Sequence, residues 1–213
     1  MPQHSVLIGF KAHLGWLACV AVAADDRDLQ PLAAQRLDLF ADQPREVREP
    51  YHVAGGWLGL ERVAAPADPL ALIERVRQLQ DALAAAQLAA LKASMAEQGL
   101  IWQRAALLVG RGIVHTLEDT LSSHAHIHIA EGEAVRDAAR AGLTALKAAW
   151  ANQDEKDSMP LAAAQLGLSS DELDQRLKQA RPAGAKSWTK EHRTIAAAAW
   201  VSHLAHSQLL ELP

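Results

Sequence analysis

The chain has one cysteine and few aromatic residues, namely six tryptophans, two phenylalanines and one tyrosine among 213 residues. The single thiol, Cys19, excludes an intramolecular disulfide framework and fits a reducing compartment. Because Cys19 lies in the apolar run GWLACVAVA, we expect a small core residue rather than a nucleophile. Basic charge is not in excess either. With a net charge of −4, the chain has no global positive field to hold nucleic acid, so such a role would need a local patch.

Long apolar runs and common cofactor motifs are also absent from the sequence. No window reaches the ~18 uninterrupted apolar residues of a membrane helix. The stretch MPQHSVLIGFK lacks the basic leader and apolar core of a signal peptide, so we expect a cytoplasmic protein without membrane association. The glycine-rich dinucleotide motif, the Walker A loop and the G-x-S-x-G elbow are missing, which excludes the common nucleotide-binding and hydrolase signatures.

What is present has the composition of a globular domain, with half of the residues hydrophobic and 22% charged. Residues 5–11 and 15–23 are apolar runs joined by a turn, and 32–40 alternates enough to form the next antiparallel strand. Residues 41–66 contain three prolines and a Gly-Gly pair, so we expect an irregular insertion there rather than a regular element.

Helices dominate the rest of the chain. Asp68 and Pro69 have the pattern of an N-cap and a first helical residue, and apolar residues recur every three or four positions up to about Gly99. A short buried strand is predicted over 103–112 and a long helix over 124–150.

The polar stretch 151–158 is compatible with an edge strand or a loop. Two short helices, 159–167 and 169–180, and a last helix over 189–210 complete the chain. An antiparallel three-stranded meander followed by alternating helices and strands is the arrangement of ribonuclease H-like α/β domains. We therefore expect one such domain over 1–213, with the insertion at 41–66 and a helical C-terminal part at 159–210.

Histidine and glutamate are concentrated in the segment SSHAHIHIAEGEAVRD, residues 122–137. On an ideal helix, residues 124, 128 and 131 lie at about 0°, 40° and −20° around the axis, so His124, His128 and Glu131 form one stripe. Two imidazoles and a carboxylate at this spacing could bind a divalent metal such as zinc or manganese. The structural alternative is a polar helix entrance, where glutamates favour the positive end of the dipole.

His126 and Glu133 fall on the opposite face of this helix and would not join that stripe. Arg136, three residues after Glu133, is placed to pair with it.

Two other places carry candidate functional residues. Lys11 and His13 lie at the end of the first predicted strand, next to the turn, where a solvent-exposed hairpin is the alternative interpretation. His192 lies in the first turn of the last helix, where a polar helix entrance is the alternative.

The segments LLVGRG and AEGEAVRDAARAGL, with the alanine-rich last helix, resemble the second half of RuvC-type Holliday junction resolvases. The resemblance covers 5–25 and 103–210 and implies a ribonuclease H-like fold. Those nucleases carry acidic residues in the first strand, at the end of the fourth strand and in the last helix. At these places this chain has Gly9 to Lys11, 110–112 and Glu191. The clustered carboxylates that two-metal phosphodiester chemistry needs are therefore missing.

The chain is also similar to a group of uncharacterised bacterial proteins with a [RK]-A-H-x-G-W turn, an S-H-A-x-I-H-x-A-E-G-E segment and a late W-T pair. Here these motifs are residues 11–16, 123–133 and 188–189. The resemblance points to the same three places as the spacing does.

Two hypotheses follow. In the first, the protein binds or acts on nucleic acid or another phosphate-containing ligand, with a divalent metal as the candidate cofactor at His124, His128 and Glu131. Its cleft would be lined by Lys11, His13, His124, His128, Glu131 and His192. In the second, the domain is a degenerate, non-catalytic module that forms homo-oligomers or binds a protein partner, with Trp57 of AGGWLGL as an exposed anchor. A small-molecule enzyme with an unrelated mechanism is a third possibility.

Overall fold

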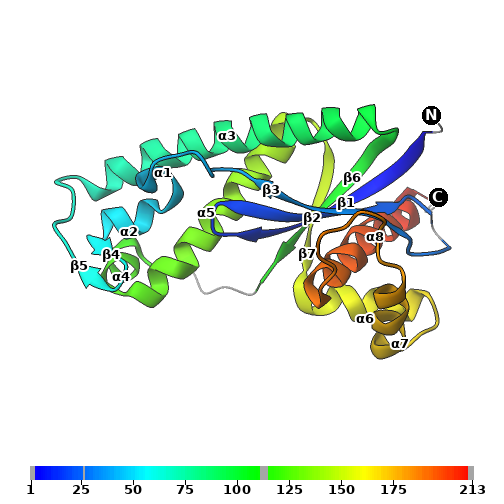
Figure 1. The fold of residues 1–213 in the computed structure, drawn as a ribbon. Coiled ribbons are helices and arrows are strands. Elements are labelled where there is room, and N and C mark those ends of the chain that lie inside the picture. The colour runs from blue at the N-terminus through cyan, green and yellow to red at the C-terminus, as the bar shows by residue number, and fades with distance from the viewer. Residues whose placement is uncertain (1–2, 26, 111–114, 211–213) are drawn as a thin grey trace.

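The computed structural model describes residues 3–25, 27–110 and 115–210 (Figure 1). A five-stranded sheet with the order β3-β2-β1-β6-β7 forms its centre. The strands are β1 (His4–His13), β2 (Trp16–Ala23), β3 (Pro31–Asp38), β6 (Leu100–Val109) and β7 (Ala149–Asp154). The first three strands form the predicted antiparallel meander, and β6 and β7 run parallel to β1.

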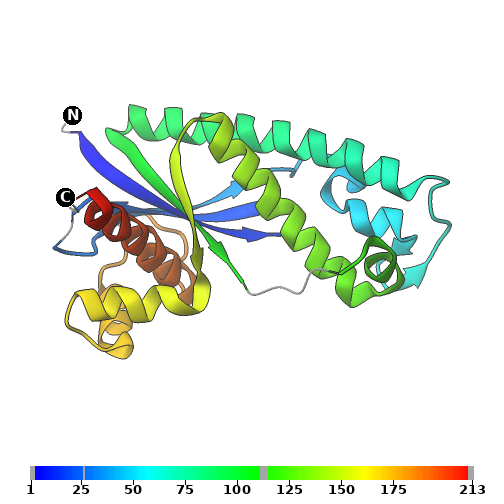
Figure 2. The ribbon, with the colours of Figure 1, turned by 180° about the vertical axis from the view of Figure 1, so that it is seen from behind.

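Helices cover both faces of the sheet. On one face lie α3 (Pro69–Glu97) and α5 (His124–Ala145), and Figure 2 shows α5 crossing the strands beneath α3. On the other lies α8 (Lys190–Leu210), with α6 (Glu155–Gln165) and α7 (Ser170–Gln179) packed around it. Because successive side chains of a strand point to opposite faces, β1 contributes to both cores. Ile8 and Phe10 pack on the α3/α5 side, and Leu7 packs on the α8 side.

Small residues set the distance between these layers. A Cβ added at Gly9 of β1 would lie 2.4 Å from the carbonyl oxygen of Ile195, so the glycine lets the backbone of α8 approach the sheet. The buried run 196–199 of α8 consists of four alanines, which keeps the helix close to the strands along this stretch.

The long helix α3 begins and ends as the sequence predicts. The Asp68 side chain accepts a hydrogen bond from the backbone N–H of Ala71, and Pro69 is the first helical residue. Gly99 follows the C-cap residue Gln98 with a φ of 79°, a left-handed conformation that glycine adopts at low cost. Strand β6 then starts at Leu100, earlier than predicted, and residues 111 and 112 of the predicted strand lie outside the described residues.

The insertion 41–66 contains regular elements, contrary to the prediction. It forms α1 (Arg45–Arg48), α2 (Pro50–Ala54) and an antiparallel pair of two-residue strands, β4 (Trp57–Leu58) and β5 (Glu61–Arg62). Proline here starts a helix instead of interrupting one, since Pro50 occupies the first turn of α2, where its missing N–H is not needed. Helices α1 and α2 have only four and five residues, too few to show a helical period in the sequence.

The predicted helix 124–150 is also shorter than expected. It follows α4 (Leu117–Ser122), ends at Ala145, and Lys147 turns the chain with a φ of 50°. Strand β7 includes Trp150 and pairs with β6, so the polar stretch 151–158 begins as an edge strand, one of its two predicted alternatives. The Asp154 side chain then accepts a hydrogen bond from the Lys156 N–H and caps α6.

Cys19 is a buried core residue, as predicted, and burial raises the pKa of its thiol. Within the described residues, none of the helices combines the length and the apolar character that crossing a membrane requires.

Candidate functional site

The carboxyl ends of the three parallel strands β1, β6 and β7 meet at one edge of the sheet, where ligands bind in many open α/β sheets. Lys11 lies there, near the end of β1, between two carboxylates. Its Nζ is 2.6 Å from Oε1 of Glu155, the first residue of α6, and 3.3 Å from Oε2 of Glu191, in the first turn of α8. Nε2 of His13 is 3.0 Å from the other oxygen of Glu191.

These contacts hold Lys11 in its charged form. Partial burial lowers the pKa of its ammonium group, but the hydrogen bonds and negative charges of Glu155 and Glu191 outweigh that effect and raise the pKa above its ordinary value. Two carboxylates therefore surround a fixed positive charge at this edge.

An aromatic stack continues the same surface. The rings of His13 and Trp16 are nearly parallel, 3.9 Å apart, and the guanidinium carbon of Arg36 lies 4.3 Å from the Trp16 ring centroid. Lys11, His13, Trp16 and Arg36 share the face of the sheet that α8 covers, because their positions are in register across β1, β2 and β3. The side chain of Arg36 is 56% exposed and pairs with Asp38.

His192 lies close by, at the start of α8. The backbone N–H of Thr189 donates to Nδ1 of His192 at 3.2 Å, and the Thr189 hydroxyl lies 2.8 Å from the same nitrogen. Burial, together with the positive charges of His13 and Arg193, lowers the pKa of His192, and the charge of Glu191 opposes this shift. These contacts fit the polar helix entrance that the sequence offered as the alternative.

A cavity of about 580 Å³ adjoins this edge between α6, α7 and α8. Its lining carries charge of both signs. The charged and hydroxyl-bearing residues in it are Asp154, Glu155, Lys156, Ser170, Asp171, Asp174, Lys190 and Thr194.

The second group of candidate residues gathers at the N-terminal end of α5, on the other layer of the molecule. His124 and His128 lie together on one helix face, as their spacing predicts, with ring centroids 4.5 Å apart. His52 of α2 joins them, at 5.3 Å from His124 and 4.8 Å from His128. One ring nitrogen from each of the three residues can be chosen so that all lie within 4.8 Å of one another.

Glu131 contacts His52 of this trio and holds the backbone of α2. Its Oε1 accepts hydrogen bonds from the N–H groups of Tyr51 (2.8 Å) and His52 (3.0 Å) and faces Nδ1 of His52 at 3.3 Å. Burial raises the pKa of Glu131 against these hydrogen bonds, which lower it. Slight burial and the neighbouring His52 and His124 lower the pKa of His128, which favours the neutral imidazole.

The six residues predicted to line one cleft thus form two groups. Lys11, His13 and His192 contact the helices of the α8 side, whereas His124, His128 and Glu131 lie on α5, whose core residues pack on the opposite face. Within the described part of the chain, no hydrogen bond, ion pair or ring contact joins the two groups. Their functional roles stay predictions.

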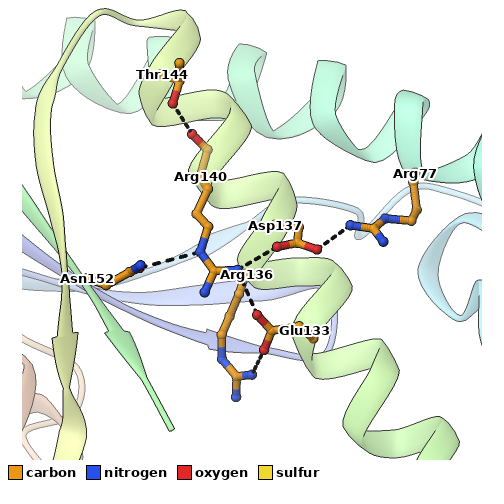
Figure 3. A network of polar contacts seen from close by, with 7 residues as sticks. All are labelled: Arg77, Glu133, Arg136, Asp137, Arg140, Thr144 and Asn152. Atoms are coloured by element: carbon orange, nitrogen blue, oxygen red, sulfur yellow. Dashed lines mark hydrogen bonds and ion pairs between the residues drawn. The ribbon is translucent and has the colours of Figure 1, made fainter. Parts of the chain in front are cut away.

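His126 and Glu133 point away from the histidine trio, as helical geometry predicts. The His126 ring stacks on His115 at 3.7 Å. Glu133 pairs with Arg136, as expected, and also with Arg140 at 2.7 Å. Figure 3 shows that this network continues through Asp137 to Arg77 of α3 and reaches Asn152 of β7, so it ties α5 to both neighbours.

Trp57 is half-buried and not exposed as the sequence predicts, and its role as an anchor stays a prediction. Its ring lies 4.9 Å from that of His124 and 4.0 Å from the guanidinium carbon of Arg62, and its indole nitrogen is buried. The exposed large apolar side chains of AGGWLGL are Leu58 and Leu60.

Sequence reasoning missed His52, Glu155 and Trp16 as members of these groups. His52 lies in the insertion, where no periodicity linked it to α5. Glu155 lies in the polar stretch 151–158, which the sequence leaves open as an edge strand or a loop. For Trp16 a signal existed, because its place directly after the turn that follows His13 puts the two rings opposite one another in a hairpin.

Comparison with solved structures finds proteins of similar architecture. The structure of T. thermophilus RuvC in complex with a Holliday junction substrate matches with a TM-score of 0.52 and 9% sequence identity, over 96% of this chain and 97% of the other. The fold is ribonuclease H-like. A second Thermus thermophilus RuvC structure matches with a TM-score of 0.48 and 10% identity, over 95% and 96% of the two chains. No protein-family profile and no curated protein sequence matches this chain.

Proposed function

We propose that this ribonuclease H-like protein binds nucleic acid at the carboxyl edge of its sheet, on the α8 face, and does not cleave it there by two-metal chemistry. The observation that carries the proposed binding is the His13–Trp16–Arg36 stack on this face. The ion pairs of Lys11 with Glu155 and Glu191 bear on cleavage. A ligand on this surface would meet both features.

The ion pairs argue against metal-dependent cleavage at this edge. Two-metal catalysis needs carboxylates that are free to bridge two cations about 4 Å apart. Here Glu155 and Glu191 both contact Lys11, and its positive charge repels a divalent ion at the same place. The resemblance to RuvC-type resolvases implies an acidic residue in this strand, where the chain has Gly9 to Lys11.

The aromatic stack supports binding. Bases stack on aromatic rings and on guanidinium planes with about 1–3 kcal/mol per base, without requiring a particular sequence. Arg36 is exposed, and its ion pair with Asp38 is of the surface kind that contributes about 0–1 kcal/mol, so exchange of Asp38 for a phosphate costs little. The related fold of T. thermophilus RuvC, with its Holliday junction substrate, makes branched DNA a suitable first probe.

Fluorescence anisotropy with labelled single-stranded, double-stranded and four-way-junction DNA tests the proposal. We expect wild-type protein to bind at least one of these, and Arg36→Ala to weaken binding several-fold and to reduce the salt slope by about one. Trp16→Ala should weaken single-stranded or junction binding more than duplex binding.

Arg75→Ala is the matched control, because Arg75 is an exposed arginine of α3, on the opposite side of the sheet. Binding lost equally in Arg36→Ala and Arg75→Ala would contradict the proposed surface, and so would absence of binding by the wild type. Incubation with Mg²⁺ or Mn²⁺ should leave the DNA intact. Cleavage that disappears in Glu191→Gln would disprove the second half of the proposal.

A further inference from the structure

We infer that His52, His124 and His128 form a binding site for a divalent transition metal of the zinc class, with Glu131 as a positioning residue. This inference is independent of nucleic-acid binding, because the three histidines lie on α2 and α5 rather than at the Lys11 edge.

The geometry brings together donors from two elements distant in sequence. Three imidazoles contribute nitrogens within 4.8 Å of one another. Zinc binds imidazole nitrogen at about 2.0–2.1 Å, so tetrahedral ligand nitrogens lie about 3.4 Å apart. Small side-chain rotations would close the trio around an ion. The rings are already steeply inclined to one another, at 79°, 70° and 83°, instead of being stacked.

The second observation is the environment of His52. Metal-binding histidines usually donate their other ring N–H to a carboxylate or carbonyl, which fixes the tautomer and orients the ring. Nδ1 of His52 faces the Glu131 carboxylate at 3.3 Å, so a proton on Nδ1 leaves the lone pair of Nε2 for a metal. Both residues are buried, and the same carboxylate oxygen holds the backbone of α2 at Tyr51 and His52.

The surroundings keep the site rigid on one side and open on the other. A Cβ at Gly55 would lie 2.8 Å from Cδ1 of Ile127, so the end of α2 packs tightly on α5 next to the trio. The Trp57 ring covers His124, whereas His128 is exposed to solvent. Three nitrogen ligands with an accessible fourth position match a zinc site that keeps water or an anionic oxygen as its fourth ligand.

The test is a metal titration of the untagged, full-length protein after treatment with a chelator. Zinc is added in competition with a chromophoric chelator, and cobalt is added separately, because its visible spectrum reports tetrahedral coordination. We expect one tightly bound equivalent of zinc and a tetrahedral cobalt spectrum. His128→Ala should lower the zinc affinity by more than the 10–100-fold typical of losing an outer partner.

His126→Ala is the matched control, since His126 lies on the same helix but stacks on His115 away from the trio. It should bind zinc as the wild type does. Glu131→Gln should weaken zinc binding about 10–100-fold and leave the tetrahedral cobalt spectrum in place, as expected for a residue that acts through His52.

Thermal unfolding gives a second readout that does not depend on a spectrum. Zinc should raise the Tm of the wild type and of His126→Ala, and should raise that of His128→Ala much less. Because the His128 side chain is exposed, we expect His128→Ala to fold as the wild type does, and circular dichroism checks this. Equal zinc binding by wild type, His128→Ala and His126→Ala would overturn the inference, as would no bound equivalent in the wild type.

Discussion

Nδ1 of His52 lies 3.3 Å from Oε1 of Glu131, and the two buried residues join the 41–66 insertion to the long helix α5. Helical spacing alone placed Glu131 with His124 and His128 as a third ligand. In the structure, the third side chain beside the two imidazoles is that of His52, and the Glu131 carboxylate accepts hydrogen bonds from backbone N–H groups of α2. If the Glu131 carboxylate moved to a metal, these two backbone N–H groups would lose their hydrogen bonds, which would lower the stability of the fold.

Two glycines of α5 predict opposite effects of the same substitution. A Cβ at Gly142 would lie 2.8 Å from Cδ1 of Leu88 and 3.1 Å from backbone atoms of α3, whereas nothing lies within 4 Å of a Cβ at Gly132. We expect Gly142→Ala to lower the free energy of unfolding by about 1–3 kcal/mol through overpacking. Gly132→Ala should raise it by about 0.5–1 kcal/mol, because alanine is the better helix former.

Urea unfolding followed by circular dichroism measures both glycine variants. Gly132→Ala serves as the control for the general effect of adding a methyl group to this helix. Destabilisation of equal size in the two variants would contradict the close approach of α3 and α5.

The network around Glu133 predicts a pH-dependent contribution to stability. Partial burial raises the pKa of this carboxyl, but hydrogen bonds from Arg140 and Arg136, and their charges, outweigh it and lower the pKa below its ordinary value (Figure 3). A lowered folded-state pKa means that the contribution is complete above the unfolded glutamate pKa of about 4.3 and is lost as the pH falls through the folded value.

Glu133→Gln should therefore lower the Tm near pH 7, and the difference from wild type should shrink as the pH falls below about 4. Thermal melts across this range measure it. Glu74→Gln, at an exposed position of α3, is the control and should change the Tm little at any pH. A Tm difference that stays constant with pH would show that the charge of Glu133 contributes nothing.

The sequence predicted the sheet better than the sites, for a physical reason. Runs such as 5–11 and 15–23 encode their own burial, and Asp68 encodes the start of α3, because strand and cap formation depend on neighbouring residues. The meeting of Lys11 with Glu155, and of His52 with His128, depends on how distant elements pack. Neither pair leaves a periodic signal, since one partner of each pair, Glu155 or His52, comes from a segment to which the sequence assigns no regular structure.

The dependence on how distant elements pack also explains why the six residues predicted to line one cleft lie in two groups. Lys11 and His13 were assigned to a strand end and His124 and His128 to a helix start, and both assignments agree with the structure. Which face of the sheet each group occupies depends on side-chain register and on the crossover of α5, and neither follows from spacing within one element. Histidine spacing on α5 therefore identified a local pair but not the layer in which it lies.

The carboxylates around Lys11 give the last prediction. Removing the ammonium group in Lys11→Ala leaves Glu155 and Glu191 with oxygens that lay 2.6 Å and 3.3 Å from Nζ, so that side-chain rotations would let them share a hard cation. We expect Mn²⁺ to stabilise this variant and not the wild type, by about 1.4 kcal/mol at a concentration ten times the Kd. Thermal melts with and without Mn²⁺ measure the shift. Lys156→Ala, an exposed lysine one residue after Glu155, is the control and should respond as the wild type does. Mn²⁺ stabilisation of the wild type to the same extent would mean that Lys11 does not keep divalent ions from this edge.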